Sequence, residues 1–277
     1  MTEGNKIRES VAAGSFYPDS ENALRNKITS FLNNIESPVD IKNIKSIISP
    51  HAGYVYSGQV AAYSYRQLTG KKFDSIFVIA PSHSEYFSFI SIFNGDAFRT
   101  PLGLLYIDKE KSKILAEKSP YIKLSEQGHL NEHSLEVQLP FIQVLYKDIK
   151  IVPIVMGQQN SRNISALGNS IGELFKDDNI LIIASTDLSH YHPYDTAVTL
   201  DSRVKELVNA FDVEHLTAGF LNNTLEMCGG GPVISAMIAS KLMGANKSRI
   251  LDYKNSGDII GDKSAVVGYM STVIYRE

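Results

Sequence analysis

The sequence predicts an α/β fold with a largely parallel, mixed central sheet and helices on both faces. Short, β-branched apolar segments alternate with longer segments of helical periodicity along the 277 residues. The segments "SIFVIA" and "LIIAS" show no polar alternation, which is typical of strands covered on both faces. Without an internal repeat or a linker, we expect a single domain spanning residues 1–277.

In the first half of the chain, apolar spacing and turn residues define the elements. Ser20 is placed to cap a helix in which Leu24, Ile28 and Leu32 share one face. A Pro-Leu-Gly turn at 101–103 separates two shorter strands. The expected helices are 21–35, 57–68 and 109–118, and the expected strands are 45–49, 74–83, 89–93 and 104–108.

In the second half, two prolines qualify the pattern. Pro140 lies inside the helical spacing of 132–146, so we expect a kink or a break there. Pro153 lies inside the apolar strand 149–156 and predicts a strand end or a local bulge. The remaining expected helices are 162–175, 197–211, 213–222 and 231–244, and the remaining strands are 179–187, 248–255 and 265–275.

Composition excludes several classes of function. The net charge of −3 and the interspersed acids and bases give no electrostatic basis for a nucleic-acid or membrane partner. One cysteine allows no intrachain disulfide. The polar segment "MTEGNKIRES" lacks the apolar centre of a signal peptide, and no apolar run approaches the roughly 18 residues of a membrane span. We therefore expect a cytoplasmic protein.

Polar residues follow three of the core strands at the point where each strand ends. His51 follows "IIS", His83 follows "FVIA", and Asp187 and His190 follow "LIIAST". Because the carboxyl ends of parallel strands meet at one edge, we expect these four side chains to converge in a crevice. Neutral imidazole is the commonest metal ligand, which favours a metal site. The alternative for each histidine is an ordinary loop or hydrogen-bonded core residue.

Cys228 lies in "EMCGGGPVI", directly before a nearly all-apolar helix. Glycines allow close backbone approach, and a helix N-terminus stabilises a thiolate. Cys228 with His51 and His83 would form a three-ligand site suited to iron, copper or zinc. The alternative is a small buried hydrophobe, the usual environment of a free cysteine.

Two further segments supply candidate pocket residues. "GHLNEHSLEVQLP" contains Glu132 and His133, and His133 lies four residues after His129, a spacing that places both histidines on one face of a helix. The alternative is a helix capped by Asn131 with both histidines on the surface. Tyr54 and Tyr56, in "SPHAGYVYSG", are expected near the mouth of the crevice.

Asp187 and His190 together suggest acid–base catalysis. The carboxylate would orient the imidazole, which would then move a proton. The alternative is that Asp187 only caps the following segment. We favour His190 over His192 because Pro193 and Tyr194 turn the chain away. The chain has neither a "GxSxG" elbow nor a nucleotide-binding glycine motif, so hydrolase and nucleotide-binding functions are unsupported.

The motifs of this chain resemble those of the Memo family. The matching segments span nearly the whole chain in the family's order and are "AGSFYP", "SPHAGYVYSG", "PSH", "NEHSLEVQLPF", "STDLSHY", "CGGGP" and "VGYMS". That family is structurally similar to the class III (LigB-type) extradiol dioxygenases, which open catechol rings with a non-haem Fe(II). The resemblance implies a similar fold.

The resemblance also implies roles for particular residues. His51 and His83 match the two metal-binding histidines, and His190 matches the acid–base histidine of the dioxygenases. Cys228 lies where the dioxygenases have a carboxylate. A thiolate is a softer ligand and is itself oxidisable, so the dioxygenase reaction does not carry over directly.

Three functions are consistent with these residues. The first is a metal-dependent redox enzyme acting on a small polar or aromatic molecule. The second is a non-catalytic protein that binds a peptide, a ligand or a metal. The third is a non-haem iron extradiol dioxygenase. The resemblance further implies a microbial pathway shared with a radical-SAM protein and an AMMECR1-type partner.

Overall fold

The computed structural model describes residues 6–36 and 39–277, so the first five residues of the polar N-terminal segment lie outside it. The strands are β1 (Ile7–Arg8), β2 (Ile44–Ser49), β3 (Ser75–Pro81), β4 (Ile90–Phe93), β5 (Ala97–Thr100), β6 (Gly103–Tyr106), β7 (Ile122–Ser125), β8 (Lys150–Met156), β9 (Ile180–Ser185), β10 (His190–His192), β11 (Lys247–Asn255) and β12 (Val266–Tyr275). The helices are α1 (Glu21–Asn33), α2 (Tyr54–Arg66), α3 (Lys109–Lys118), α4 (His133–Glu136), α5 (Leu139–Leu145), α6 (Ser161–Leu174), α7 (Tyr194–Asn209), α8 (Val213–Leu221), α9 (Gly230–Leu242) and α10 (Ser256–Ile260).

The main sheet is mixed with a parallel centre, which confirms the predicted fold class. Its order is β10-β12-β2-β9-β3-β8-β4-β7, with β11 added onto β12. β2, β9, β3 and β8 run parallel to one another, whereas β12 and β4 are antiparallel to their neighbours in this central group. A second, three-stranded sheet has the order β1-β5-β6.

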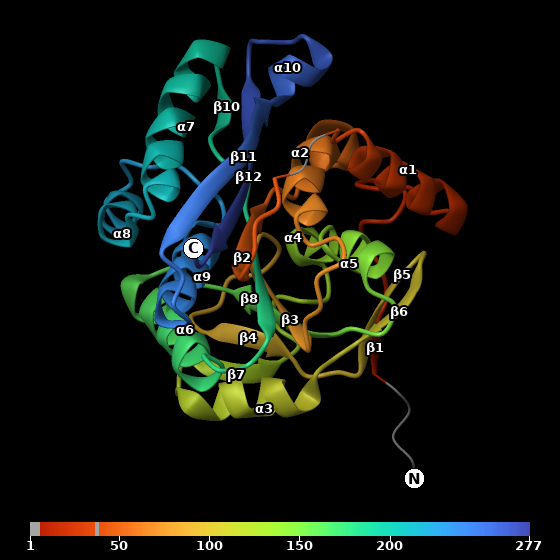
Figure 1. The fold of residues 1–277 in the computed structure, drawn as a ribbon, viewed down its shortest axis with the longest axis vertical. Helices are drawn as coiled ribbons and strands as arrows, with labels where there is room; N and C mark the ends of the chain where they lie inside the picture. Colours follow the sequence, from red (N-terminus) through yellow and green to blue (C-terminus); the bar gives the residue numbers. More distant parts are fainter. Residues whose placement is uncertain (1–5, 37–38) are drawn as a thin grey trace.

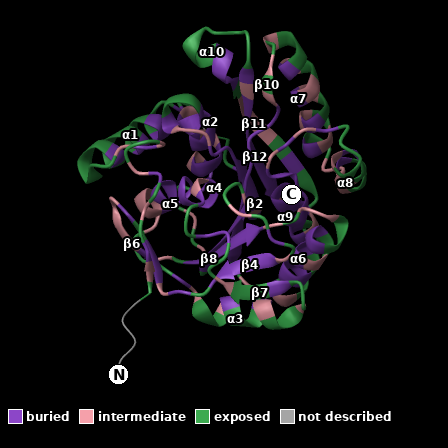
Figure 2. Cartoon of the chain, turned by 180° about the vertical axis from the view of Figure 1, so that it is seen from behind, coloured by how far each residue is buried: buried purple, intermediate pink, exposed green. Residues whose placement is uncertain are grey.

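Helices cover both faces of the main sheet (Figure 1). α1, α2 and α5 pack over one face, and α6 and α9 pack over the other. Alternate residues of β9 point into the two cores: Leu181 and Ile183 into the first, Ile180 and Ile182 into the second. Coverage on both faces explains why these strands consist of uninterrupted apolar residues. Figure 2 shows the central strands in the colour of buried residues.

The helical segment is interrupted next to Pro140, as the sequence predicted. α4 ends at Glu136 and α5 begins at Leu139, so Pro140 lies in the first turn of a new helix. Proline is tolerated there because the first backbone N–H groups of a helix have no intrahelical partner.

The prediction for Pro153 was wrong. β8 pairs with β3 in unbroken register from Lys150 to Met156, without an end or a bulge at the proline. On its other side, β8 pairs with β4 only from Ile154 to Met156. Pro153 therefore lies just beyond the β4 ladder, where the missing N–H group leaves no partner unsatisfied.

α2 begins at Tyr54, three residues earlier than predicted. The sequence did not predict β1, β5, β7, β10 and α10.

Across residues 6–36 and 39–277, no helix combines the length and apolar character that crossing a bilayer requires.

Candidate metal centre

The carboxyl ends of three adjacent parallel strands open onto a cavity of about 610 Å³. β2 leads to His51, β3 leads to His83, and β9 leads to Asp187. All three residues line the cavity, together with His133 and His190. The predicted convergence of the strand-end residues follows from the parallel arrangement of these three strands.

His51 is buried and its tautomer is fixed by its neighbours. Nδ1 of His51 lies 2.9 Å from Oγ of Ser185. The Ser185 hydroxyl donates its only hydrogen to the carbonyl of Ser134, at 2.7 Å. Nδ1 of His51 must therefore be the donor, which leaves the lone pair on Nε2. Burial, followed by the neighbouring His83, lowers the pKa of His51 well below its ordinary value, so the ring is neutral.

His83 is oriented by a buried carboxylate. Its Nδ1 lies 3.0 Å from Oε1 of Glu132, and its backbone N–H donates to Oε2. Burial alone would raise the pKa of Glu132, but the hydrogen bonds from His83 and Ser134 lower it to about 2. Since an ionised carboxylate only accepts, Nδ1 of His83 donates and Nε2 carries the lone pair.

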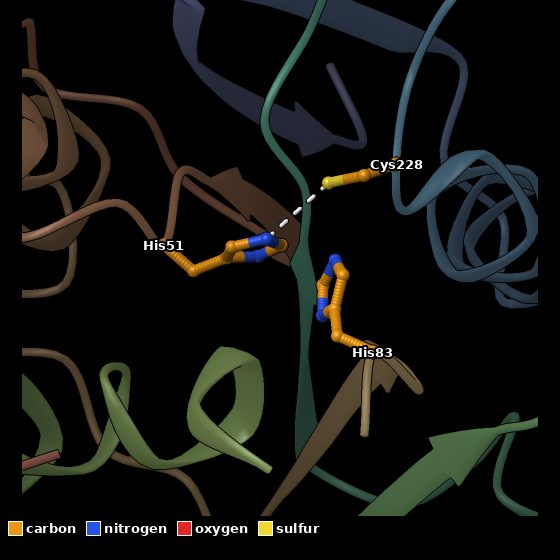
Figure 3. Close-up of side chains that lie close together, drawn as sticks. All are labelled: His51, His83 and Cys228. Atoms are coloured by element: carbon orange, nitrogen blue, oxygen red, sulfur yellow. Dashed lines mark hydrogen bonds between the residues drawn. The ribbon is translucent and has the colours of Figure 1, made fainter. Parts of the chain in front are cut away.

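Cys228 brings its sulfur to the same point from a distant segment. Sγ lies 3.2 Å from Nε2 of His51 and accepts the backbone N–H of Asp187 at 3.2 Å. Figure 3 shows His51, His83 and Cys228 pointing toward one another. Burial raises the pKa of the Cys228 thiol, so the free thiol is protonated at neutral pH.

The loop that carries Cys228 is held by close backbone contacts. Side-chain Nε2 of Gln159 donates to the Cys228 carbonyl at 2.7 Å, and Oε1 accepts the N–H of Gly231 at 2.7 Å. A Cβ at position 229 would lie 2.2 Å from the carbonyl oxygen of Ser185. Gly229 is therefore required for the loop to approach the end of β9.

These donors fit a transition-metal ion. One ligand atom each from His51, His83 and Cys228 lies within 4.8 Å of the others. The Sγ–Nε2 distance of 3.2 Å is near the roughly 3.5 Å that two ligands of a tetrahedral ion would span. Two neutral imidazoles and one thiol suit zinc, copper or iron.

Asp187 does not orient His190, contrary to the predicted pairing. Oδ1 of Asp187 accepts the backbone N–H of His51 at 2.9 Å, whereas Nδ1 of His190 bonds to the carbonyl of Leu188 at 2.8 Å. Asp187 therefore positions His51. Burial raises the pKa of Asp187 to about 7. A carbonyl only accepts, so His190 is protonated on Nδ1 and has its basic lone pair on Nε2.

The two tyrosines predicted near the cavity point in different directions. Tyr56 lines the cavity, whereas Tyr54 is buried and donates its hydroxyl to the carbonyl of Val137 at 2.8 Å. Residues two apart on a helix face nearly opposite directions, so only one of the pair can face the crevice. The prediction of Tyr54 as a pocket residue was wrong.

The segment around Glu132 also differs in part from expectation. His133 lines the cavity and stacks on Phe16, with ring centroids 4.5 Å apart. Glu132 is 1% exposed and lies behind His83 rather than at the cavity wall. His129 precedes the helix and is 1% exposed, so it neither shares a helical face with His133 nor lies on the surface. The cap of α4 is Glu132, not Asn131.

Ser185 and Gln159 were not selected from the sequence, although one orients His51 and the other holds the Cys228 loop. Ser185 lies near the carboxyl end of the predicted strand 179–187, which is the one signal in the sequence that favoured it; in the structure it ends β9, beside β2. Nothing in the sequence around Gln159 singled it out.

The chain is similar to known proteins over nearly its whole length. The family model described as "Memo-like protein" matches residues 8–273. This chain belongs to the Memo family. A MEMO1 family protein of Nitrosopumilus maritimus is 37% identical over 268 residues, covering 95% of this chain and 98% of that protein. A MEMO1 family protein of Methanobrevibacter smithii is 38% identical over 282 residues, covering 96% and 99%.

Among solved structures, the Memo-family chain is similar to the uncharacterized protein JW3007 from Escherichia coli K12. The TM-score is 0.59 at 16% sequence identity, covering 83% of this chain and 99% of that chain. At this identity the likeness shows a shared fold.

Proposed function

We propose that this Memo-family protein binds one transition-metal ion through Nε2 of His51, Nε2 of His83 and Sγ of Cys228, and carries out redox chemistry on a small ligand in the adjoining cavity. The observation that carries the proposal is the fixed tautomer of both histidines. Each ring donates Nδ1–H to an oxygen of Ser185 or Glu132, so each presents its Nε2 lone pair toward the sulfur.

The surrounding residues support chemistry on a bound ligand. A bound ion would supply Lewis acidity and, for iron or copper, electron transfer. His190 lines the cavity, and burial lowers its pKa, so its neutral ring can accept a proton on Nε2. Tyr56, Tyr191 and Tyr269 also line the cavity and offer aromatic surfaces to a planar ligand.

By the resemblance described above, Cys228 would lie where the ring-opening dioxygenases have a carboxylate, and a thiolate ligand makes copper and zinc as suitable as iron. The substitution favours redox chemistry other than catechol opening, because a thiolate ligand is itself oxidisable.

Anaerobic reconstitution with Fe(II), Cu(I) or Zn(II), followed by metal analysis after gel filtration, tests the proposal. We expect wild type to retain metal, and His51→Ala and Cys228→Ser to retain less of it than wild type. His215→Ala is the matched control, because His215 pairs with Asp212 at 2.8 Å on the surface. Equal retention by wild type and the two site variants would contradict the proposal.

A further inference from the structure

A second group of ligand atoms lies beside the first and shares His83. One ligand atom each of His83, Glu132 and His133 lies within 4.8 Å of the others. Oε1 of Glu132 is 3.0 Å from Nδ1 of His83 and 3.4 Å from Nδ1 of His133. Two ligand atoms on a tetrahedral ion with bonds of about 2.0–2.1 Å lie roughly 3.3 Å apart, so both distances are suitable.

The environment of His133 points to a ligand rather than to a structural bond. Its Nδ1 faces Oε1 of Glu132 at 3.4 Å, longer than a good N–H···O hydrogen bond. Within residues 6–36 and 39–277, no hydrogen bond reaches the His133 ring, whose contact with Oε1 of Glu132 has only ion-pair distance. The stacked Phe16 holds the ring in place.

Glu132 is built to hold a negative charge at this point. It is 1% exposed, and Oε2 accepts the backbone N–H groups of His83 and Ser84. Oε1 accepts the N–H of Ser134 at 3.1 Å and faces both histidine rings. The side chains of His83 and His133 are 34% and 26% exposed and line the cavity, so an ion can reach them from it.

We propose that this protein has a second metal position, formed by Nδ1 of His83, Oε1 of Glu132 and Nδ1 of His133. The inference rests on the proposed function, because His83 would contact one ion through each ring nitrogen. The second ion takes the place of the proton on Nδ1 of His83, and that proton passes to solvent. The His83 ring would then be an imidazolate between the two positions, and this imidazolate, the His133 imidazole and the Glu132 carboxylate suit Zn(II), Fe(II) or Co(II), without the preference for soft ions that the thiolate gives the first position.

Anaerobic titration of the full chain with Co(II) separates the two positions. The first equivalent of Co(II) is expected to give the near-ultraviolet sulfur-to-cobalt absorption of a thiolate ligand. The second equivalent is expected to add visible bands but no further sulfur-to-cobalt absorption. His133→Phe keeps a ring against Phe16 but removes both nitrogens, and should abolish only the second equivalent. Cys228→Ser should abolish the sulfur absorption. His192→Gln, at a surface histidine 2.8 Å from Glu226, is the matched control and should bind as wild type does.

The outcomes are distinct. A single equivalent in wild type that carries the sulfur absorption would overturn the second position and leave the proposed function intact. A second equivalent that persists in His133→Phe would also overturn it. If wild type binds one equivalent of Co(II) that depends on His133 and shows no sulfur-to-cobalt absorption, the second position is supported and the proposed function is contradicted. Thermal unfolding of apo His133→Phe checks that the variant folds.

Discussion

At the scale of single residues, the site depends on which nitrogen of each histidine carries the proton. The hydroxyl of Ser185 and the carboxylate of Glu132 settle this for His51 and His83, since neither oxygen is free to donate to Nδ1. Groups that orient a metal-binding imidazole typically contribute 10–100-fold to metal affinity. The chemistry of the centre is therefore set by residues that do not themselves touch the proposed first ion.

The protonation of Cys228 predicts how metal affinity depends on pH. Burial raises the pKa of the thiol, and a metal binds the thiolate, so binding releases one proton at neutral pH. Release becomes easier as pH rises, so apparent affinity should increase about tenfold per pH unit between roughly pH 6 and 8. His51 adds no slope in this range, because burial lowers its pKa and keeps it neutral.

Anaerobic competition against a chelator of known affinity measures this slope. Cys228→Ser should bind more weakly and with a flatter pH dependence. A wild-type affinity that does not change with pH would mean that the thiol is not deprotonated on binding.

At the scale of elements, the predicted strands were the most informative part of the sequence. The order of the strands in the sheet could not be obtained from periodicity. We assumed that the strands run parallel, and β2, β9 and β3 are indeed parallel neighbours. Tyr54 shows the limit of the approach. The expected helix began at residue 57 and left Tyr54 in the loop near the mouth of the crevice, whereas α2 begins at Tyr54 and buries its side chain.

The loop before α9 predicts a strong effect of one added methyl group. Gly229→Ala places a Cβ 2.2 Å from the Ser185 carbonyl and 2.8 Å from Cβ of Thr186, and backbone cannot move aside as a flexible side chain can. We expect a loss of about 1–3 kcal/mol in the free energy of unfolding, together with weaker metal binding as Cys228 shifts.

Urea unfolding and metal retention measure the two effects of Gly229→Ala. Gly53→Ala is the control, because its nearest neighbour would be an ordinary contact at 3.6 Å. Equal unfolding free energies for the two variants would show that the loop does not need glycine.

At the scale of the whole molecule, a buried ion pair joins the N-terminal segment to α4, the helix that begins at His133 and is capped by Glu132. Arg8 pairs with Glu136, and both side chains are almost fully buried. Arg8 also donates to the carbonyls of His129 and Glu132, at 3.0 and 2.6 Å. Glu136 accepts the Tyr17 hydroxyl as well. The small sheet is thus connected to the wall of the cavity.

Glu136→Gln should be strongly destabilising, because it leaves the Arg8 guanidinium buried without a counter-charge. Removing one partner of a buried pair costs about 3–5 kcal/mol. The control is Glu21→Gln in the exposed Glu21–Arg25 pair, which should change stability little. Urea unfolding of both variants checks this, and similar midpoints would contradict the prediction.

The sequence by itself determined the α/β class, because strands covered on both faces are apolar, and the family, because its motifs span the chain. It also selected His51, His83 and Cys228 as residues that come together, the two histidines because strand-end residues share one edge of a parallel sheet. Only the tertiary structure decided that Glu132 accepts a hydrogen bond from His83, that Asp187 bonds to His51 rather than to His190, and that Tyr54 faces the core. These relations join residues that are distant in the chain, or depend on side-chain direction. Hydrophobic periodicity does not tell which distant polar groups meet, and it gives side-chain direction only where the start of the element is placed correctly.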